Sequence, residues 1–172
     1  EKTRQGTILA IQHLLSITKR IGVIVVQDSV LFSPGAEHKL RQDLINKGVV
    51  HTVIAMPNSL MPHTNISFSI LLLTPSKKND SVNYFDLRSS HFCSGSGRVK
   101  ILNSYEDIIA TIAAKKIQPK NGLSEHFKNI SNFEIESNNY NLSPSKYVLS
   151  ADIKSVNKIL QVKAIVSLCD HI

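Results

Sequence analysis

Hydrophobic residues recur at the spacing of a helix at the start of the chain and then gather into short runs typical of strands. Apolar residues at three- and four-residue intervals predict a helix over residues 3–19. The β-branched run 23–26 is too short for a helix and predicts a strand that is buried on both faces. A second helix is expected over residues 36–46, since Gly48 stands where a helix usually ends.

Three more strands are predicted in the middle of the chain. Residues 49–56 and 68–73 are strongly apolar, and residues 82–87 alternate between apolar and polar types. Because only a short turn joins the last two, we expect them to form an antiparallel pair at the edge of the sheet. The order of strand, helix and strand over residues 22–57 is typical of an α/β fold.

The second half of the chain has weaker patterns. A loop is expected over residues 88–103 and a helix over residues 105–116. Residues 126–148 are mainly polar, and a terminal helix is expected over residues 151–168. Gly95-Ser-Gly97 precedes a polar stretch, which favours a flexible loop over a phosphate-binding turn.

Charge favours a nucleic acid as partner. The 172 residues carry a net charge of +7 at pH 7, and such a surface attracts phosphates. The lysines and arginines are dispersed, so charge alone also fits an ordinary basic protein.

Membranes, metals and disulfides are not indicated. No apolar run reaches the length of a membrane span. Cys93 and Cys169 are far apart and the histidines are scattered, which predicts reduced thiols in the cytoplasm and no metal site. Both ends of the sequence lack the marks of a natural terminus, so we expect a piece of a longer protein.

Three blocks, in this order, carry the most specific pattern in the sequence. They are residues 30–41, with Val-Leu-Phe, Gly-Ala-Glu and Lys-Leu-Arg; residues 56–73, with Met-Pro-Asn-Ser-Leu-Met-Pro-His-Thr-Asn followed by an apolar run; and residues 139–148, Asn-Tyr-Asn-Leu-Ser-Pro-Ser-Lys-Tyr-Val. Together they resemble the N6-adenine DNA methylases that form the M subunits of type I restriction-modification systems. The resemblance covers roughly residues 3–148.

The resemblance implies a fold, a reaction and partners. It implies the C-terminal half of a Rossmann-like, S-adenosylmethionine-dependent methyltransferase sheet followed by a helical tail. We therefore divide the chain into a partial α/β domain, residues 1–120, and a tail with the terminal helix, residues 121–172. The implied reaction is methyl transfer from S-adenosylmethionine to N6 of an adenine flipped out of DNA. The implied partners are DNA and the specificity and restriction subunits of the same system.

Two motifs that such enzymes need are missing. The sequence has neither a glycine-rich turn after a first strand nor an Asn/Asp-Pro-Pro-aromatic loop. In the family both precede the part that corresponds to Thr3. We therefore expect no catalytic residue in this chain and no cofactor binding by the chain alone.

One loop is a candidate for contact with DNA. In the family, the loop that corresponds to residues 57–65 lies beside the flipped base. The candidate residues are Asn58, Ser59, Leu60, Met61, His63, Thr64 and Asn65. Met61 replaces the family's aromatic residue, Asn58 replaces a proline, and His63 and Asn65 replace glycines. An ordinary solvated connection is the alternative.

Two further surfaces are candidates for protein contacts. The family's C-terminal region contacts the specificity subunit, so Ile153, Val156 and Leu160 are candidate partner contacts, with packing inside the chain as the alternative. An exposed strand invites pairing, so the chain is also expected to self-associate through residues 23–26. A hydrolase built on Asp28-Ser29 is disfavoured because no nucleophile elbow is present. A non-catalytic α/β module that binds DNA or a subunit remains the alternative function.

The charge leads to a prediction for DNA binding. We expect the chain to bind a DNA duplex weakly and in a salt-dependent manner, because bound phosphates release counterions. With about two phosphate contacts, raising the salt from ~50 to ~200 mM weakens binding about tenfold. Fluorescence anisotropy of a labelled duplex measures this change. An affinity that is equal at the two salt concentrations would contradict the prediction.

Overall fold

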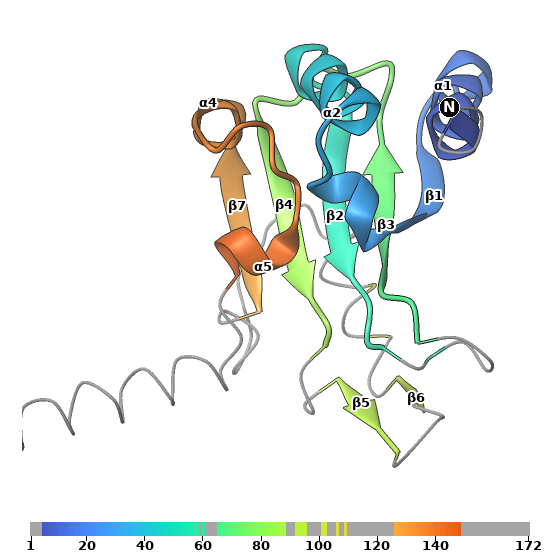
Figure 1. Cartoon of the computed structure of the whole chain (residues 1–172), viewed down its shortest axis with the longest axis vertical. Coiled ribbons are helices and arrows are strands. Elements are labelled where there is room, and N and C mark those ends of the chain that lie inside the picture. Colours follow the sequence, from blue (N-terminus) through green and yellow to red (C-terminus); the bar gives the residue numbers. More distant parts are fainter. Residues whose placement is uncertain are drawn as a thin grey trace, which may run out of the picture.

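A five-stranded sheet forms the centre of the protein (Figure 1). The computed structural model describes residues 5–58, 60, 65–88, 92–95, 101–102, 106, 109 and 126–148. Across the sheet the strands follow the order β1 (Gly22–Gln27), β3 (Phe68–Leu73), β2 (Val50–Ala55), β4 (Ser81–Asp86) and β7 (Phe127–Ser131).

Strand directions place three carboxyl ends at one edge of the sheet. Strands β2 and β4 are parallel, whereas β3 is antiparallel to both of its neighbours, β1 and β2. Strand β7 is antiparallel to β4. Strands β1, β2 and β4 therefore run the same way, and the arrowheads of β2 and β4 point to the lower edge in Figure 1. Ligands of open α/β sheets bind outside the carboxyl ends of parallel strands.

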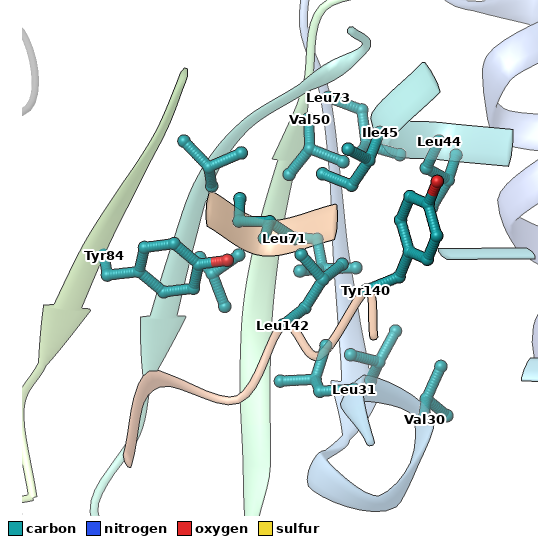
Figure 2. Close-up of a cluster of buried hydrophobic side chains, with 14 of the residues drawn as sticks. Val30, Leu31, Leu44, Ile45, Val50, Leu71, Leu73, Tyr84, Tyr140 and Leu142 are labelled. Atoms are coloured by element: carbon teal, nitrogen blue, oxygen red, sulfur yellow. The ribbon is translucent and has the colours of Figure 1, made fainter. Parts of the chain in front are cut away.

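Helices pack against one face of the sheet. They are α1 (Gln5–Ile17), the 3-10 helix η1 (Asp28–Leu31), α2 (Ala36–Asn46), α4 (Asn132–Ser137) and α5 (Pro144–Tyr147). Their apolar sides join the sheet in the main core cluster, part of which is drawn in Figure 2. Helix α2 ends before Gly48, as predicted, and Gly48 has a φ of +64°, which a glycine adopts without strain.

The other face of the sheet carries a second, smaller cluster. Ile54, Met56 and Phe85 are its buried members on and next to the strands, and Leu87 and Phe92 extend it beyond β4. Among the described residues this cluster covers the part of the face around β2, β3, β4 and the start of β7, where Phe127 packs against Phe85. The face is bare at β1, where Val23 and Val25 are 57% and 50% exposed.

Arg41 connects three segments on the helical face of the sheet: α2 itself, the turn formed by η1 and the residues after it, and the segment after α4. This α2 residue is 2% exposed, and its guanidinium group donates to three carbonyl oxygens. Nε donates to Tyr140 at 2.8 Å, and Nη1 donates to Val30 at 2.8 Å and to Ser33 at 2.9 Å. The amide of Leu142 donates to Leu31 at 2.9 Å, beside these bonds. The segment that follows α4 is thereby fixed to η1.

Two predictions about strands are wrong. Strands β3 and β4 do not pair, because β2 lies between them, and β4 is not an edge strand, because β7 adds outside it. The short turn between them only carries the chain across the end of β2. The run 23–26 is a strand, but it is not buried on both faces, because α1 covers one face only.

The mainly polar stretch 126–148 contains more structure than its pattern indicated. It forms β7, α4 and α5, and it places Ile135, Tyr140 and Leu142 in the main core. The expected loop 88–103 includes two short paired strands, β5 (Cys93–Ser94) and β6 (Ile101–Leu102).

The two helices predicted in the second half of the chain lie partly or wholly outside the described residues. Glu106 and Ile109 are helical and exposed, and the rest of the helix expected over residues 105–116 lies outside the described residues. The terminal helix expected over residues 151–168 lies wholly outside them. The division after residue 120 stays a prediction, although β7 belongs to the same sheet as β1 to β4.

The bonds of Arg41 lead to a stability prediction. Replacing Arg41 with alanine removes a charged donor from three carbonyl oxygens, so the free energy of unfolding is expected to fall by about 3 kcal/mol. Arg41→Lys keeps the charge but lacks the planar fork, and an intermediate loss is expected. The matched control is Lys39→Ala on the exposed side of α2, with a change within about 0.5 kcal/mol. Urea unfolding measures all three; equal losses for Arg41→Ala and Lys39→Ala would contradict the account.

Candidate functional site

A pocket of about 390 Å³ lies at the carboxyl-end edge of the sheet. It forms where β1 passes into η1, where β3 begins and where the chain leaves β4, and α5 closes one side. Its lining residues are Gln27, Asp28, Ser29, Phe32, Ile66, Ser67, Arg88, Ser143 and Ser145. The volume lies within the range of pockets that bind small ligands, ~300–1,000 Å³.

Asp28 presents a half-buried carboxylate to this pocket. Its Oδ1 accepts a hydrogen bond from the Ser69 hydroxyl at 2.6 Å. Among the described residues, Oδ2 has no hydrogen-bond partner. Asp28 follows β1 directly and its amide donates to Ser67 at 3.1 Å, so the backbone around the carboxylate is fixed.

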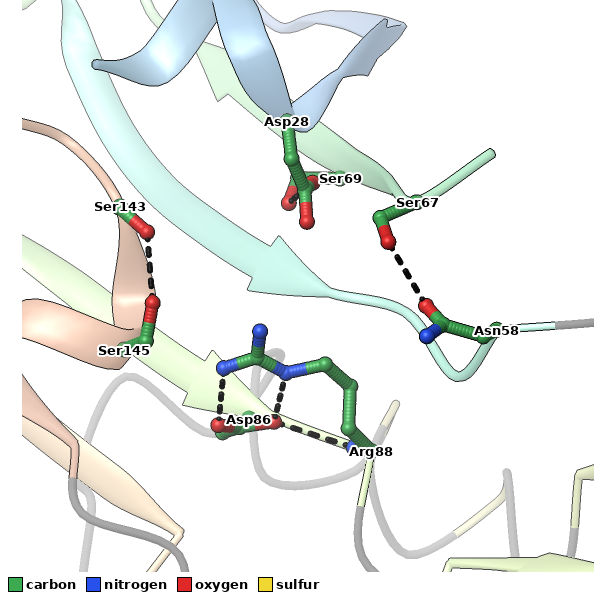
Figure 3. A network of polar contacts seen from close by, with 8 residues as sticks. All are labelled: Asp28, Asn58, Ser67, Ser69, Asp86, Arg88, Ser143 and Ser145. Atoms are coloured by element: carbon green, nitrogen blue, oxygen red, sulfur yellow. Dashed lines mark hydrogen bonds and ion pairs between the residues drawn. The ribbon is translucent and has the colours of Figure 1, made fainter. Parts of the chain in front are cut away.

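Arg88 presents a guanidinium group to the same pocket. Its Nε donates to Asp86 Oδ1 at 2.8 Å and its Nη2 donates to Oδ2 at 2.6 Å. The Asp86 side chain is only 3% exposed, so the guanidinium group of Arg88 neutralises a buried carboxylate through a bidentate pair. The hydrogen bond with Asp86 raises the pKa of Arg88. The third nitrogen, Nη1, has no partner among the described residues and faces the space below Asp28 (Figure 3).

The walls of the pocket combine apolar and hydroxyl groups. Phe32 and Ile66 are each 53% exposed although both are apolar. On the opposite side, the hydroxyl groups of Ser143 and Ser145 lie 2.8 Å apart. Both serines lie close in sequence to Tyr147, which anchors their segment to the sheet. The ring centroid of Tyr147 lies 4.8 Å from that of Tyr84 in β4. Burial raises the pKa of Tyr147 to about 12.

The three sequence blocks that carry the methylase resemblance meet at this pocket. The first block contributes Phe32, the second contributes Ile66 and Ser67, and the third contributes Ser143 and Ser145. Arg41 of the first block also binds Tyr140 of the third. The blocks are far apart in the chain, so their convergence identifies this edge as the candidate site.

The predicted DNA-facing loop lies at the same edge, and the structure describes part of it. Asn58 is exposed and accepts a hydrogen bond from Ser67 at 2.9 Å. Leu60 is half-buried against the second cluster, and Asn65 is exposed. Ser59, Met61, His63 and Thr64 lie outside the described residues, as do the candidate partner contacts Ile153, Val156 and Leu160.

Sequence reasoning missed the pocket itself. Phe32 belongs to a family block, but the local sequence does not predict that its side chain is exposed. Its apolar neighbours Val30 and Leu31 are buried, and nothing in the pattern distinguishes Phe32 from them. Arg88 stood in a predicted loop without any motif. The only available signal was that Asp28 and Arg88 each lie within two residues of the end of a predicted strand.

No metal or membrane feature is found in the described part of the chain. Within it, no three His, Cys, Asp or Glu side chains gather closely enough to hold a metal ion. None of its helices is both long and apolar enough to cross a membrane.

The fold matches that of methyltransferase subunits with solved structures. The chain is similar to the type I restriction-modification system methyltransferase subunit from Streptococcus thermophilus, with a TM-score of 0.72 and 22% identity, over 86% of this chain and 31% of that one. It is also similar to a chain from a structural study of complex assembly and conformational transition in the type I restriction-modification system, with a TM-score of 0.64 and 18% identity, over 96% of this chain and 38% of that one. These likenesses define an α/β fold of the methyltransferase class.

Sequence comparison identifies the family. The family model of the N-6 DNA methylases matches residues 2–155. The type I restriction enzyme MpnII methylase subunit of Mycoplasma pneumoniae is 27% identical over 154 residues, which cover 84% of this chain and 27% of that relative. The chain therefore belongs to the N-6 DNA methylase family. It spans only 27–38% of the length of these three relatives.

Proposed function

We propose that this chain is the part of an N6-adenine DNA methyltransferase that follows its cofactor-binding and catalytic motifs. The observation that carries the proposal is the family match over residues 2–155, within a chain that spans about a third of its relatives. The whole enzyme transfers a methyl group from S-adenosylmethionine to N6 of adenine in DNA. The chain contributes the far half of the sheet and a DNA-facing edge.

The described residues do not fit a cofactor site. A site for S-adenosylmethionine needs a glycine-rich turn after a buried strand, where the backbone approaches the ligand closely. Here β1 passes from Gln27 straight into η1 at Asp28, with no glycine before Gly35. The remaining segments of the protein therefore supply the cofactor site, and the chain alone binds none.

The DNA-facing edge comprises the predicted loop from Asn58 to Asn65 and the adjoining pocket. The basic charge of +7 supports a polyanion as partner. The specificity and restriction subunits of the same system are the proposed protein partners, with Ile153, Val156 and Leu160 as contacts to the specificity subunit. The related complex was solved in a study of type I assembly, which supports partners of this kind. A cytoplasmic location is proposed from the sequence, in which the two cysteines, Cys93 and Cys169, lie far apart.

Self-association through β1 is proposed for the chain on its own. Strand β1 is at one end of the strand order, so its outer backbone groups have no strand beside them in the described sheet. The exposed valines next to this edge, Val23 and Val25, add an apolar surface.

The second candidate function is a non-catalytic module derived from a methylase. It agrees, as the first candidate does, with a sequence that has neither a Pro-Pro pair nor a glycine-rich turn after a first strand. The two functions differ in what the longer protein does, since only an enzyme needs a cofactor site in its other segments.

Calorimetry and product analysis test the proposal. Titration of S-adenosylmethionine into the 172-residue chain is expected to give no binding heat, because the residues do not form the cofactor site. The longer protein that contains this chain is expected to bind S-adenosylmethionine at micromolar concentration. It is also expected to form N6-methyladenine in DNA, detected by mass spectrometry of digested DNA.

The same measurements can also contradict the proposal. Micromolar binding of S-adenosylmethionine by the chain alone would refute the division of labour between the segments. A longer protein that binds no cofactor and forms no N6-methyladenine would exclude the enzyme and leave the non-catalytic module.

A further inference from the structure

We propose that the pocket beside η1 is a nucleobase subsite in which Phe32 provides the stacking surface. The inference rests on the proposed function only in taking DNA as the partner. It assigns a role to residues outside the predicted loop, and it explains how a chain with Met61 in place of the family's aromatic residue still offers an aromatic surface to a base.

Phe32 has an exposed ring on a fixed backbone, as a stacking surface needs. It is 53% exposed and lines the pocket, whereas its neighbours Val30 and Leu31 are buried. The Phe32 amide donates to Ser29 at 3.2 Å, and Arg41 binds the carbonyls of Val30 and Ser33 on either side. These bonds fix the backbone on both sides of the ring, so a base that stacks on Phe32 has to order only its side-chain rotamer.

The polar groups of the pocket suit the edge of a base. Asp28 Oδ2 is an acceptor and Arg88 Nη1 is a donor, and both face the same space (Figure 3). Adenine offers an amino donor next to a ring-nitrogen acceptor on its Watson–Crick edge, and cytosine offers the same pair. Ile66 adds an apolar contact, as expected where one face of a ring is to be covered.

The local charge favours a base over a phosphate. Arg88 is already neutralised by Asp86 through two hydrogen bonds, and Asp28 adds a further negative charge. A phosphate in this pocket would meet more carboxylate than guanidinium charge. A neutral ring with one donor and one acceptor avoids that repulsion.

Nuclear magnetic resonance of the 15N-labelled 172-residue chain tests the inference with two ligands. Deoxyadenosine monophosphate is expected to shift, in a saturable way, the amide signals of Ser29, Phe32 and Ser67 and the Nε signal of Arg88. Deoxyribose 5-phosphate, which lacks the base, is expected to leave these signals unchanged.

Variants of two exposed phenylalanines provide the matched comparison. Phe32→Ala is expected to weaken nucleotide binding about tenfold or more, since stacking contributes ~1–3 kcal/mol per base. Phe32→Leu keeps an apolar side chain without a π face, and an intermediate effect is expected. Phe133→Ala is the control, because Phe133 is 78% exposed on α4 and does not line the pocket. Thermal unfolding verifies that all three variants fold.

Three results would overturn the inference. They are equal shifts with deoxyribose 5-phosphate, no shifts at the pocket up to the solubility of the nucleotide, and equal binding by the Phe32→Ala and Phe133→Ala variants. Duplex binding measured on the same samples separates this failure from that of the proposed function. Salt-dependent duplex binding without nucleotide binding at the pocket rejects the subsite alone, whereas loss of duplex binding altogether also rejects DNA as the partner.

Discussion

The arrangement of this protein depends on the buried guanidinium group of Arg41. Its three hydrogen bonds connect α2 with Val30 inside η1, with Ser33 just after η1 and with Tyr140 in the segment after α4. Tyr140 and Leu142 of that segment then enter the main core beside Leu31 (Figure 2). Without this group, three carbonyl oxygens in the same region would lose a charged donor. The two walls of the pocket, Phe32 and the Ser143–Ser145 pair, are therefore positioned by one side chain that does not line the pocket.

The two faces of the sheet differ in how they are covered. Helices close the face that holds the main core, whereas the smaller cluster on the other face leaves β1 bare. The exposed valines of β1 agree with a chain that spans 27–38% of its relatives. Because the carboxyl ends of β1, β2 and β4 share one edge, the residues that line the candidate site gather there.

Local patterns predicted most of the first half of the fold. Both helices and the strands β1, β2, β3 and β4 lie where periodicity indicated, because each is a compact run with clear breaks. Pairing was predicted less well, since a short turn between two strands does not reveal that a third strand lies between them. Burial of β1 was also wrong, because a β-branched run looks the same whether one face or both are covered.

The site was harder to predict than the fold because its contacts are long-range. Arg41 and Tyr140 are 99 positions apart, and neither residue type indicates such a partner. The family resemblance rests on three blocks that all contribute residues to the pocket, including the block with Phe32. Only the folded chain shows that these blocks share a pocket with Asp28 and Arg88.

The most direct test of this account is amide hydrogen exchange at Leu142. Its amide donates to Leu31 at 2.9 Å, and its side chain is fully buried. If the segment after α4 is part of the main core, this amide exchanges as slowly as the amides of β2 and β3. Exchange at the rate of an unprotected peptide, while the strands stay protected, would show that the segment opens independently and would contradict the arrangement around Arg41.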